Sequence, residues 1–588
     1  MRETATPFAA DHSGHRNVTD LLVRRERAAP DHAAFDVPED GGWRRVSTTE
    51  FADTVRAAAK GLIAQGVGAG DAVAIMSPTR YGWAVADLAV WFAGGVVVPV
   101  YDSSSPEQVA EILHDAGVRA AFSGDDRSRA LLESCTLPLG VWSLDDDLDR
   151  LAALGEGVDD LDLEARRTTA GPDTPATIVY TSGTSGAPRG AVLTHANFLG
   201  QVLNIAAAYR DIVRSDGSTV IFLPLAHVLA RGLQLICLAS GMRIAHLSAP
   251  SEVIAALPSL RPTFLVVVPR VLEKIAEAAA QKAATAGLSR VWDDAVRTAV
   301  AAGSRREARE AGARGTWAPV AAARTRVHDA VFFRRVRALL GGRIRYILSG
   351  GAPLPTRTSL LFRGMGVPVV EGYGLTETTA PLTGNLPGAI RSGTVGVPLP
   401  GSAVRIADDG EVLARGVGVF SGYRDPRDDA DAFVDGWFRT GDLGRLDDAG
   451  RLILEGRTKD VVTTSQGKTV SPARWEREVE SSPLVAYAVT VGDDRPYLTA
   501  MLLLDREAVA RVHDVRDPRP LDDDPAIRAL LEPVVTAANA RVARSERVRR
   551  FALAYAEPDD RELVTPTLKI RRRALLQRAS DTIDRLYL

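Results

Sequence analysis

The sequence predicts an α/β protein in which a large N-terminal domain of doubly wound sheets carries a small β-rich subdomain and is followed by a small, mobile α+β domain. Three observations predict this class. The chain has 588 residues, more than one hydrophobic core usually supports. Short apolar strand-like runs alternate with helix-period patterns up to position 348, which is typical of parallel sheets covered by helices. After Gly401 short segments alternate with Asp- and Gly-rich turns, as in antiparallel sheets.

The large domain is expected to start its alternation with a helix over residues 51–65, where apolar side chains recur at helical spacing. The strand-like runs that follow are short and apolar, and each is expected to lead through a loop into a helix. They cover residues 72–76, 95–100, 177–180, 220–223, 264–268 and 343–348. Because α/β sheets bind ligands beyond the carboxyl ends of their strands, the loops after these runs are the expected site.

The β-rich subdomain is expected over residues 401–456. Its strand-like segments cover residues 403–406, 411–415, 418–423 and 451–455. The pattern then changes to helical segments such as residues 524–541. We therefore predict a large domain over residues 1–457 and a C-terminal domain over residues 458–588, with the boundary near Lys459. No internal repeat is evident.

A long stretch rich in Ala and Arg, residues 274–340, precedes the last predicted strand of the large domain. Its composition favours two or three solvated helices. A basic face that meets membrane lipid is the alternative, but Arg and Glu alternate here, which weakens that interpretation. Peripheral membrane contact is therefore left open, and so is the oligomeric state.

The composition excludes several classes of protein. The 71 Lys and Arg residues against 74 Asp and Glu residues leave a net charge of −3, whereas a general nucleic-acid binder carries a basic excess. Cys135 and Cys237 are too few for a disulfide framework or a multi-cysteine metal site, and they indicate a reducing compartment. The first residues are polar, and the longest apolar run is about 14 residues, short of the roughly 20 that span a bilayer. We expect a soluble, cytoplasmic protein.

Lysine is rare in this chain. Only 6 of the 71 basic residues are lysines: Lys60, Lys274, Lys282, Lys459, Lys468 and Lys569. Arg is therefore the default cation, and a position that keeps Lys is a candidate for chemistry that needs a compact ammonium group.

The most informative segment is residues 180–190, which read YTSGTSGAPRG. Glycines let backbone N–H groups turn inward, the hydroxyl side chains add donors, and Arg189 adds charge, so the loop suits a polyphosphate. It is not a Walker A loop, because no Gly-Lys-Ser/Thr follows at the required spacing. A flexible surface loop is the alternative for this segment taken alone.

Further segments supply the other parts of a nucleotide site. Residues 371–378, EGYGLTET, offer an aromatic face, a hydroxyl and a carboxylate, the parts needed to stack a base, orient a phosphate and hold Mg²⁺. Residues 349–353, SGGAP, follow a predicted strand and could bring backbone close to a planar ligand. Asp442 follows a Gly turn, where its carboxylate could bind two ribose hydroxyls. Isolated cations come from the segments GRTKD at 456–460 and TPTLKI at 565–570.

This set of motifs, in this order, resembles the adenylate-forming superfamily, which includes acyl-CoA synthetases, non-ribosomal peptide adenylation domains and luciferases. The resemblance covers roughly residues 45–575. The spacing is similar to that of the long-chain fatty acyl-CoA synthetase branch, supported by LPLAHV at 223–228, VPR at 268–270 and the helical insert before residue 341.

The resemblance implies a role for each matching residue. The phosphate loop would cradle the β- and γ-phosphates through Thr181, Ser182, Gly183, Thr184, Ser185, Gly186 and Arg189. Thr184 and Glu377 would lie near Mg²⁺, and Thr376 would contact the α-phosphate. Adenine and the acyl carboxylate would be flanked by Gly351, Ala352, Pro353, Tyr373 and Gly374. Asp442 and Arg457 would hold the ribose, Lys459 would be the hinge, and His227 would line the acyl site. Lys569 would bridge the acid's carboxylate and the α-phosphate.

Two positions depart from the family's pattern. Its phosphate loop usually carries Lys where this chain has Arg189, which keeps the charge but spreads it over a planar fork. Some relatives place an aromatic gate four residues after the histidine, where this chain has Arg231. That arginine could hold an anionic head group or pair with a carboxylate, and the sequence leaves both open.

The implied reaction is ATP-dependent activation of a fatty acid, with a long chain expected, first to an acyl adenylate and then to acyl-CoA. The implied cofactors are ATP, Mg²⁺ and coenzyme A as co-substrate, and the partners are small-molecule substrates and no nucleic acid. One alternative is a fatty acyl-AMP ligase that loads an acyl carrier protein. The other is a non-catalytic acyl- or nucleotide-sensing protein, which is disfavoured because Glu377, Asp442 and Lys569 are all present.

Overall fold

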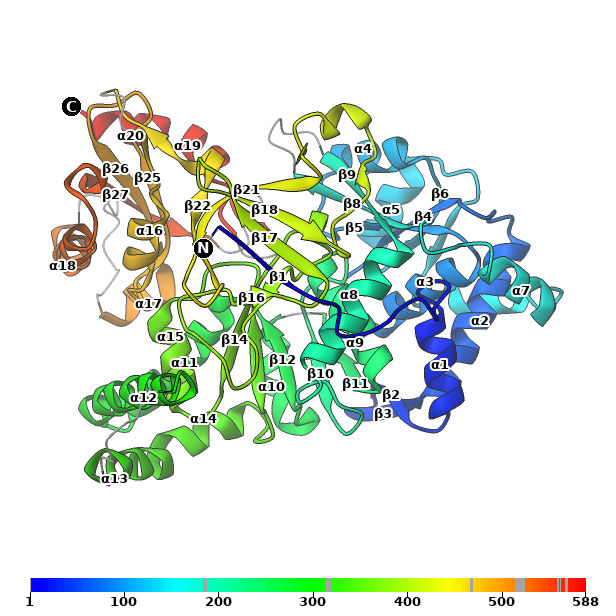
Figure 1. The fold of residues 1–588 in the computed structure, drawn as a ribbon, viewed down its shortest axis with the longest axis horizontal. Coiled ribbons are helices and arrows are strands. Elements are labelled where there is room, and N and C mark those ends of the chain that lie inside the picture. The colour runs from blue at the N-terminus through cyan, green and yellow to red at the C-terminus, as the bar shows by residue number, and fades with distance from the viewer. Residues whose placement is uncertain are drawn as a thin grey trace.

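The computed structural model describes residues 2–182, 188–248, 250–312, 319–465, 469–512, 524–557, 560, 562–565 and 569–588. It confirms the α/β class, with a large N-terminal part built on sheets and a smaller C-terminal part (Figure 1). In Figure 1 the C-terminal elements, orange to red, stand at the left edge of the molecule.

The first sheet of the large domain has seven strands in the order β19-β9-β8-β5-β4-β6-β7. Of its strands with parallel partners, β4, β5 and β8 fall on predicted runs, whereas β6 and β7 were not predicted. The bounds in chain order are β4 (Ala72–Met76), β5 (Val96–Val100), β6 (Val118–Ser123), β7 (Val141–Ser143), β8 (Pro175–Ser182), β9 (Pro188–Thr194) and β19 (Gly422–Tyr423). Strands β4 and β5 are buried on both faces, which explains their continuous apolar sequence.

One expectation for this sheet is wrong. The run at 177–180 was expected to lead through a loop into a helix, but β8 pairs with an antiparallel β9, and only then does helix α8 (His195–Ala208) begin. The phosphate loop therefore connects the two strands of a hairpin. Thr181 lies opposite Arg189 in the register of this pair, so Arg189 is part of a strand.

The second sheet has nine strands in the order β16-β15-β14-β13-β12-β10-β11-β2-β3. The pairs from β14 to β2 are parallel, and those at both ends are antiparallel. The bounds are β2 (Ala33–Glu39), β3 (Gly42–Ser47), β10 (Ser218–Ile221), β11 (Arg243–His246), β12 (Phe264–Val267), β13 (Tyr346–Ser349), β14 (Val369–Tyr373), β15 (Thr383–Gly384) and β16 (Val397–Pro398). Parallel strands bring the loops after β10, β12, β13 and β14 to one edge.

Helices between these sheets form the main core of the large domain. Helix α3 (Tyr81–Phe92) is apolar on nearly all sides and buries Trp83 and Trp91 completely or nearly so, as expected of a helix surrounded by protein. The same cluster includes side chains of α2 (Thr48–Ala64), α8 and α9 (Val228–Ser240). The remaining helices of this half are α1 (Asp20–Ala28), α4 (Pro106–Ala116), α5 (Asp126–Ser134), α6 (Leu148–Leu154) and α7 (Asp160–Arg167).

The Ala- and Arg-rich stretch is helical, as the sequence predicts. It contains α11 (Pro269–Thr285), α12 (Ser289–Glu310), α13 (Pro319–His328), η1 (Asp329–Phe333) and α14 (Arg334–Leu339), with α10 (Pro250–Leu260) before it and α15 (Thr356–Gly364) after it. Helices α12 and α13 project at the lower left of Figure 1. Helix α12 crosses α15 closely, because a Cβ on Gly364 would lie 1.8 Å from the Ala299 carbonyl oxygen. No helix of the described ranges has the length and apolar character needed to cross a membrane.

The β-rich subdomain is a six-stranded antiparallel sheet around β17 (Ser402–Ile406), β18 (Glu411–Gly416) and β21 (Trp437–Leu446). Its other strands are β1 (Glu3–Thr6), β20 (Phe433–Val434) and β22 (Leu452–Arg457). The segment 418–423 was expected to belong here, but its only strand, β19, pairs with β9 of the first sheet. This pairing ties the subdomain to the phosphate hairpin.

The C-terminal part is built on a three-stranded sheet, β25 (Val485–Val491), β26 (Leu498–Asp505) and β27 (Val548–Ala556). Helices α16 (Ala473–Glu480) and α18 (Pro525–Ala540) pack on one face, and α19 (Arg572–Arg578) and α20 (Ser580–Arg585) on the other. Helix α17 (Arg506–Val512) and the short pair β23 (Val462–Thr463) with β24 (Thr469–Val470) complete it. The boundary at residue 458 and the hinge at Lys459 stay predictions.

Candidate active site

Tyr373, Asp442 and Arg457 form a connected polar group beyond the end of β14. The Tyr373 hydroxyl donates to Asp442 Oδ2 at 2.7 Å, and Arg457 Nε lies 2.9 Å from Asp442 Oδ1. Strand pairing places Asp442 opposite Arg457, so β21 and β22 set the ion pair. Burial, together with the negative charge of Asp442, raises the pKa of Tyr373 well above its usual value, so the phenol stays protonated. The sequence predicted all three residues for one ligand, and the structure brings them together.

The position of Asp442 is fixed by a residue that the sequence analysis missed. Its backbone N–H donates to Thr440 Oγ1 at 3.1 Å, while the Thr440 hydroxyl donates to the Val412 carbonyl oxygen at 2.7 Å. These bonds brace the turn at Gly441, whose φ is +68°. The Asp442 backbone is thereby fixed within β21, at the irregularity in its pairing with β18.

A second polar group lies at the phosphate hairpin. Glu377, in the 3₁₀ turn Thr376–Thr378, is buried and accepts a hydrogen bond from the Tyr423 hydroxyl at 2.9 Å. The guanidinium of Arg189 lies over the Tyr423 ring, 4.5 Å from its centroid. Arg189 Nε is buried and has no hydrogen-bond partner within the described ranges. Tyr423 is a second missed residue, since the sequence showed only its strand pattern.

Part of the predicted phosphate loop lies outside the described residues: Gly183, Thr184, Ser185 and Gly186. Of Ser182 the structure describes only its place in β8. Thr376 is half-buried beside Glu377. Among the described residues no group of three or more His, Cys, Asp or Glu side chains could hold a metal ion. A metal site built on Thr184 and Glu377 therefore stays a prediction.

The segment Gly350–Pro353 emerges from β13 next to the end of β14. Ser349 pairs with Glu371, so the loop and Tyr373 leave the sheet at the same edge. Gly351 has a φ of +80°, and Gly351, Ala352 and Pro353 are exposed. At Gly374 a Cβ would lie 2.9 Å from the Leu382 backbone nitrogen, so only glycine fits this position. The predicted planar-ligand segment thus borders the Tyr373 group.

Lys569 reaches this edge from the C-terminal part. Its backbone closes a small hairpin, with Thr565 N–H donating to the Lys569 carbonyl at 2.8 Å and Lys569 N–H donating to Thr565 Oγ1 at 3.0 Å. Burial and the positive charges of Arg457 and Lys459 lower the pKa of Lys569 to about 8, against the opposing effect of Asp442. No carboxylate within the described ranges is in ion-pair distance of Lys569, so this cation lacks a counter-ion of its own.

Next to the Lys569 hairpin, Arg572 anchors the start of α19. Its guanidinium donates to the Thr490 carbonyl at 2.9 Å and to the buried carboxylate of Glu476, and Nε lies 4.0 Å from Asp460 Oδ1. Asp460 follows the exposed Lys459. This network connects the hairpin to the segment where the hinge is predicted.

His227 approaches Lys569 from the large domain. It precedes α9, and its Nδ1 accepts a hydrogen bond from the Leu229 N–H at 3.1 Å. Burial, with the nearby positive charge of Lys569, lowers the pKa of His227 to about 4. The imidazole is therefore neutral at pH 7 and carries its proton on Nε2, which can donate a hydrogen bond.

Arg231 is not part of this site, which resolves the choice left open above. It is 1% exposed, and its Nε donates to Asp87 Oδ2 at 3.0 Å while Nη1 donates to Thr177 Oγ1 at 2.8 Å. Its guanidinium also lies 4.7 Å from the centroid of Trp91. Arg231 thus pairs with a carboxylate inside the core, and neither an aromatic gate nor a head-group site exists at this position.

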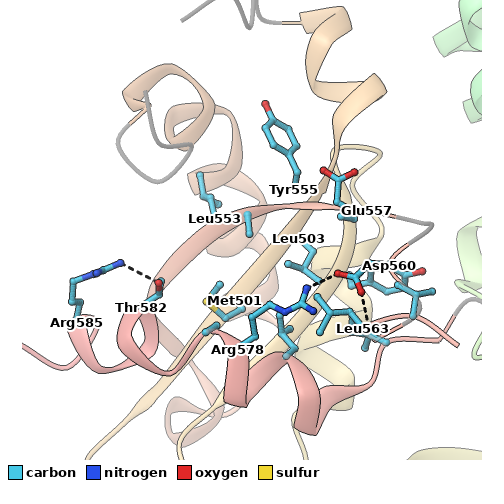
Figure 2. Close-up of a pocket in the computed structure, with 17 residues that line it drawn as sticks. Met501, Leu503, Leu553, Tyr555, Glu557, Asp560, Leu563, Arg578, Thr582 and Arg585 are labelled. Carbon is cyan, nitrogen blue, oxygen red and sulfur yellow. Dashed lines mark hydrogen bonds and ion pairs between the residues drawn. The ribbon is translucent and has the colours of Figure 1, made fainter. Parts of the chain in front are cut away.

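The C-terminal part also holds a pocket of about 370 Å³ between its sheet and α19. Figure 2 shows Arg578 directed at Asp560, and Met501 and Leu503 along the sheet side. Val564 and Ile570, which flank the Lys569 hairpin, line this pocket, but Lys569 does not. The pocket therefore borders the Lys569 hairpin without including the Lys569 side chain, and it is separate from the candidate active site.

Comparison with known proteins gives the family. Residues 22–424 match the AMP-binding enzyme family, and residues 459–588 match the AMP-binding enzyme C-terminal domain. The chain belongs to the AMP-binding enzyme family. It is 37% identical to the long-chain-fatty-acid–CoA ligase FadD15 of Mycobacterium tuberculosis, over 100% of both chains. It is 28% identical to the long-chain-fatty-acid–CoA ligase 6 of Mus musculus, over 89% of this chain and 79% of that one.

Among solved structures, ATP-bound MatB from Rhodopseudomonas palustris is similar with a TM-score of 0.71 and 22% identity. The match covers 96% of this chain and 99% of that chain. At this identity the likeness concerns the fold. The sequence relatives confirm the resemblance to the adenylate-forming superfamily and to its long-chain fatty acyl-CoA synthetase branch.

Proposed function

We propose that this protein uses ATP to convert a long-chain fatty acid to an acyl adenylate, and then to acyl-CoA, with release of pyrophosphate and AMP. Its full-length relative FadD15 is named a long-chain-fatty-acid–CoA ligase. One structural observation carries the proposal: Lys569 of the C-terminal part stands, without a counter-ion among the described residues, beside the Tyr373–Asp442–Arg457 group and His227.

The chemical problem is that a carboxylate is a poor acyl donor, since its leaving group would be oxide. Attack of the carboxylate on the α-phosphate of ATP forms a mixed anhydride with AMP, and pyrophosphate leaves. Such transfer needs in-line positioning and cations around the developing charge. Lys569 supplies an ammonium group that forms no ion pair with a carboxylate of the described residues, so the anionic substrate carboxylate and α-phosphate become its partners. This is the role we assign to it.

The other residues divide the nucleotide between them. Asp442 presents a fixed carboxylate to the ribose hydroxyls, with Arg457 beside it. The Tyr373 ring and residues 351–353, with Gly374, border the adenine. Arg189, half-buried with its Nε unpaired among the described residues, would bind the β- and γ-phosphates, and Thr376 would contact the α-phosphate. Thr181 stands at the end of β8, where the loop with Ser182, Gly183, Ser185 and Gly186 would follow the phosphates.

Glu377 is the protein ligand that we propose for Mg²⁺, with Thr184 as its companion. The fit is chemical: Mg²⁺ in phosphate-transfer sites is held by one or two protein oxygens and by substrate phosphates. The carboxylate of Glu377 is buried. Among the described residues its one side-chain hydrogen bond comes from the neutral phenol of Tyr423. Bound there, the ion would neutralise phosphate charge.

In the second half-reaction the coenzyme A thiol attacks the acyl carbonyl and AMP leaves. Lys569 and the thiol need the same space beside this carbonyl, so we propose that the C-terminal domain, residues 458–588, turns about Lys459 between the two steps. The proposal extends to the neutral His227, which would border the acyl chain. Both cysteines are free thiols, Cys237 being buried, which supports a reducing, cytoplasmic setting.

The deciding experiment measures AMP release with ATP, Mg²⁺ and coenzyme A across saturated fatty acids of increasing length. We expect turnover that increases toward long chains, because each buried methylene contributes roughly 0.8 kcal/mol. Loading of a carrier protein but not of coenzyme A would support the acyl-AMP ligase alternative. Binding of ATP and fatty acid without AMP release would support a sensing protein and would overturn the proposal.

A further inference from the structure

Two cations of the large domain reach one carboxylate of the C-terminal part. Arg270 and Lys274 lie one turn apart on α11, and Asp505 is the last residue of β26. Lys274 Nζ is 3.0 Å from Asp505 Oδ2, and the Arg270 guanidinium donates to the same oxygen. The adjoining helix α17 lies beside α11, where Lys274 reaches Glu507 (Figure 1). These ion pairs join two parts of the chain that are more than 200 residues apart.

Asp505 is firmly anchored in the C-terminal part. Its Oδ1 accepts a hydrogen bond from the Ala508 N–H at 3.0 Å, which caps the start of α17. Asp505 is 9% exposed and is the last residue of β26, whose eight residues are all buried. Although burial acts to raise the pKa of Asp505, the Ala508 N–H and the two cations bring it below its usual value. The group is ionised at neutral pH.

The surroundings of this pair are acidic. Arg270 also lies 3.2 Å from Glu273 and 3.6 Å from Glu277, and Lys274 lies 3.8 Å from Glu277 and 3.9 Å from Glu507. Four carboxylates therefore surround two cations among the described residues. Glu273 and Glu277 belong to α11, whereas Asp505 and Glu507 belong to the C-terminal part. Without the cations, acidic side chains of the two parts would face one another and repel.

We propose that Arg270 and Lys274 are positioning residues for adenylation, a statement that rests on the function proposed above. By holding Asp505 they keep the C-terminal domain in the orientation that brings Lys569 beside Asp442 and Arg457. The same contact must separate when the domain turns for thioester formation. Neither cation touches the reacting atoms; they act through the placement of Lys569.

The charge arrangement predicts an asymmetry between the two sides of the contact. Replacing Asp505 by Asn removes the attraction and also one of the four carboxylates, and Asn can still cap α17. Replacing Arg270 by Gln removes a cation that contacts three of these carboxylates, and acidic groups then face one another across the contact. Lys274 also contacts three of them, but its side chain is more exposed than that of Arg270, so its charge is better screened by solvent. The Arg270 variant is therefore expected to lose more adenylation than the Asp505 variant.

The test compares both half-reactions in the full-length enzyme. Pyrophosphate–ATP exchange with a fatty acid reports adenylation, and thioester formation from supplied acyl adenylate and coenzyme A reports the second step. We expect R270Q to lower exchange about tenfold, K274Q and D505N to lower it less, and thioester formation to stay unchanged or rise in all three. D584N is the matched control, because Asp584 pairs with Arg495 inside the C-terminal part.

If Arg270 had a purely structural role, R270Q would lower the rates of both half-reactions together. That result, or any result in which R270Q leaves the ratio of exchange rate to thioester-formation rate unchanged, overturns the proposal. Urea unfolding of each variant distinguishes a loss of folding stability from a displaced C-terminal domain. Because Lys274 is half-exposed, K274Q disturbs little packing. If the wild-type protein itself shows no exchange, the proposed function fails first. If the wild type performs both steps and R270Q keeps their ratio, only the positioning proposal fails.

Discussion

Arg231 and Lys569 are both cations in largely buried surroundings, and the protein treats them in opposite ways. Arg231 has a carboxylate in contact, a hydroxyl acceptor and aromatic rings around its guanidinium. Burial and the nearby cations Arg457 and Lys459 lower the pKa of Lys569 to about 8, although the carboxylate of Asp442 acts in the opposite direction. A cation that the core neutralises is part of the architecture, whereas one with no ion-pair partner among the residues that the structure describes is prepared for an anion from outside.

The largest expected effect concerns the neutralised cation. Replacing Arg231 by Met leaves the carboxylate of Asp87 buried and unpaired, which should lower the free energy of unfolding by about 3–5 kcal/mol. The double variant R231M/D87L removes both charges and should recover most of this loss. Urea unfolding measures both. A stable R231M protein with an altered fatty-acid length profile would instead make Arg231 a substrate contact and break the comparison.

The second effect concerns the cation without a counter-ion. Replacing Lys569 by Ala should lower pyrophosphate exchange roughly 10²–10³-fold, since one preorganised donor to developing charge is lost. K569R should fail similarly, because a planar guanidinium does not reproduce a compact ammonium group. Thioester formation from supplied acyl adenylate should largely survive in both variants, and the unfolding free energy should not fall. Exchange near the wild-type rate in K569A would refute this assignment.

The third effect is a pH dependence. The pKa of Lys569 is lowered from 10.5 to about 8, and the cation is the active form. The kcat/KM for adenylation should therefore be constant at neutral pH and fall about tenfold for each pH unit above 8. His227, with a pKa of about 4, should contribute no inflection near pH 6.5. An adenylation rate that stays level to pH 10 would contradict the unpaired state of Lys569.

The smallest effect tests how rigid the site around Lys569 is. Replacing Tyr373 by Phe removes the hydroxyl that donates to Asp442, and the KM for ATP should rise about fivefold, corresponding to roughly 1 kcal/mol. Y209F is the matched control, because the buried Tyr209 hydroxyl donates to the Asn385 carbonyl, away from the ribose group. If both variants changed the KM equally, the Tyr373 bond would have no special role in holding Asp442.

Six of the large domain's strands with parallel partners were predicted from the sequence, namely β4, β5, β8, β10, β12 and β13, whereas β2, β6, β7, β11 and β14 were not. The run at 72–76 is β4 to the residue, and the predicted helix at 524–541 is α18, Pro525–Ala540. Such segments follow local pattern, because a strand buried on both faces must be continuously apolar. The hairpin of β8 with β9 was missed, because the glycine-rich segment was interpreted only as a loop and β9 after it was not recognised. The other partner of β9 is β19, more than 200 residues away in the chain.

The candidate site divides in the same way. Tyr373, Asp442 and Arg457 were recognisable from their motifs. Thr440 lies in the same motif as Asp442, but its role, like that of Tyr423, depends on contacts that only the folded chain forms. The partner of Arg231 also depended on the folded structure. From the sequence it could face a ligand or a carboxylate, and Asp87, its partner, lies 144 positions earlier.

The amino-acid sequence by itself determined the α/β class, the order of the nucleotide-binding motifs and the rarity of lysine that drew attention to Lys569. These properties are local or compositional, so they can be seen along the chain. Only the tertiary structure decided which cation is neutralised and which is not. Burial and distance to a counter-charge depend on segments far apart in the chain, and these two quantities separate a structural arginine from a lysine available for catalysis.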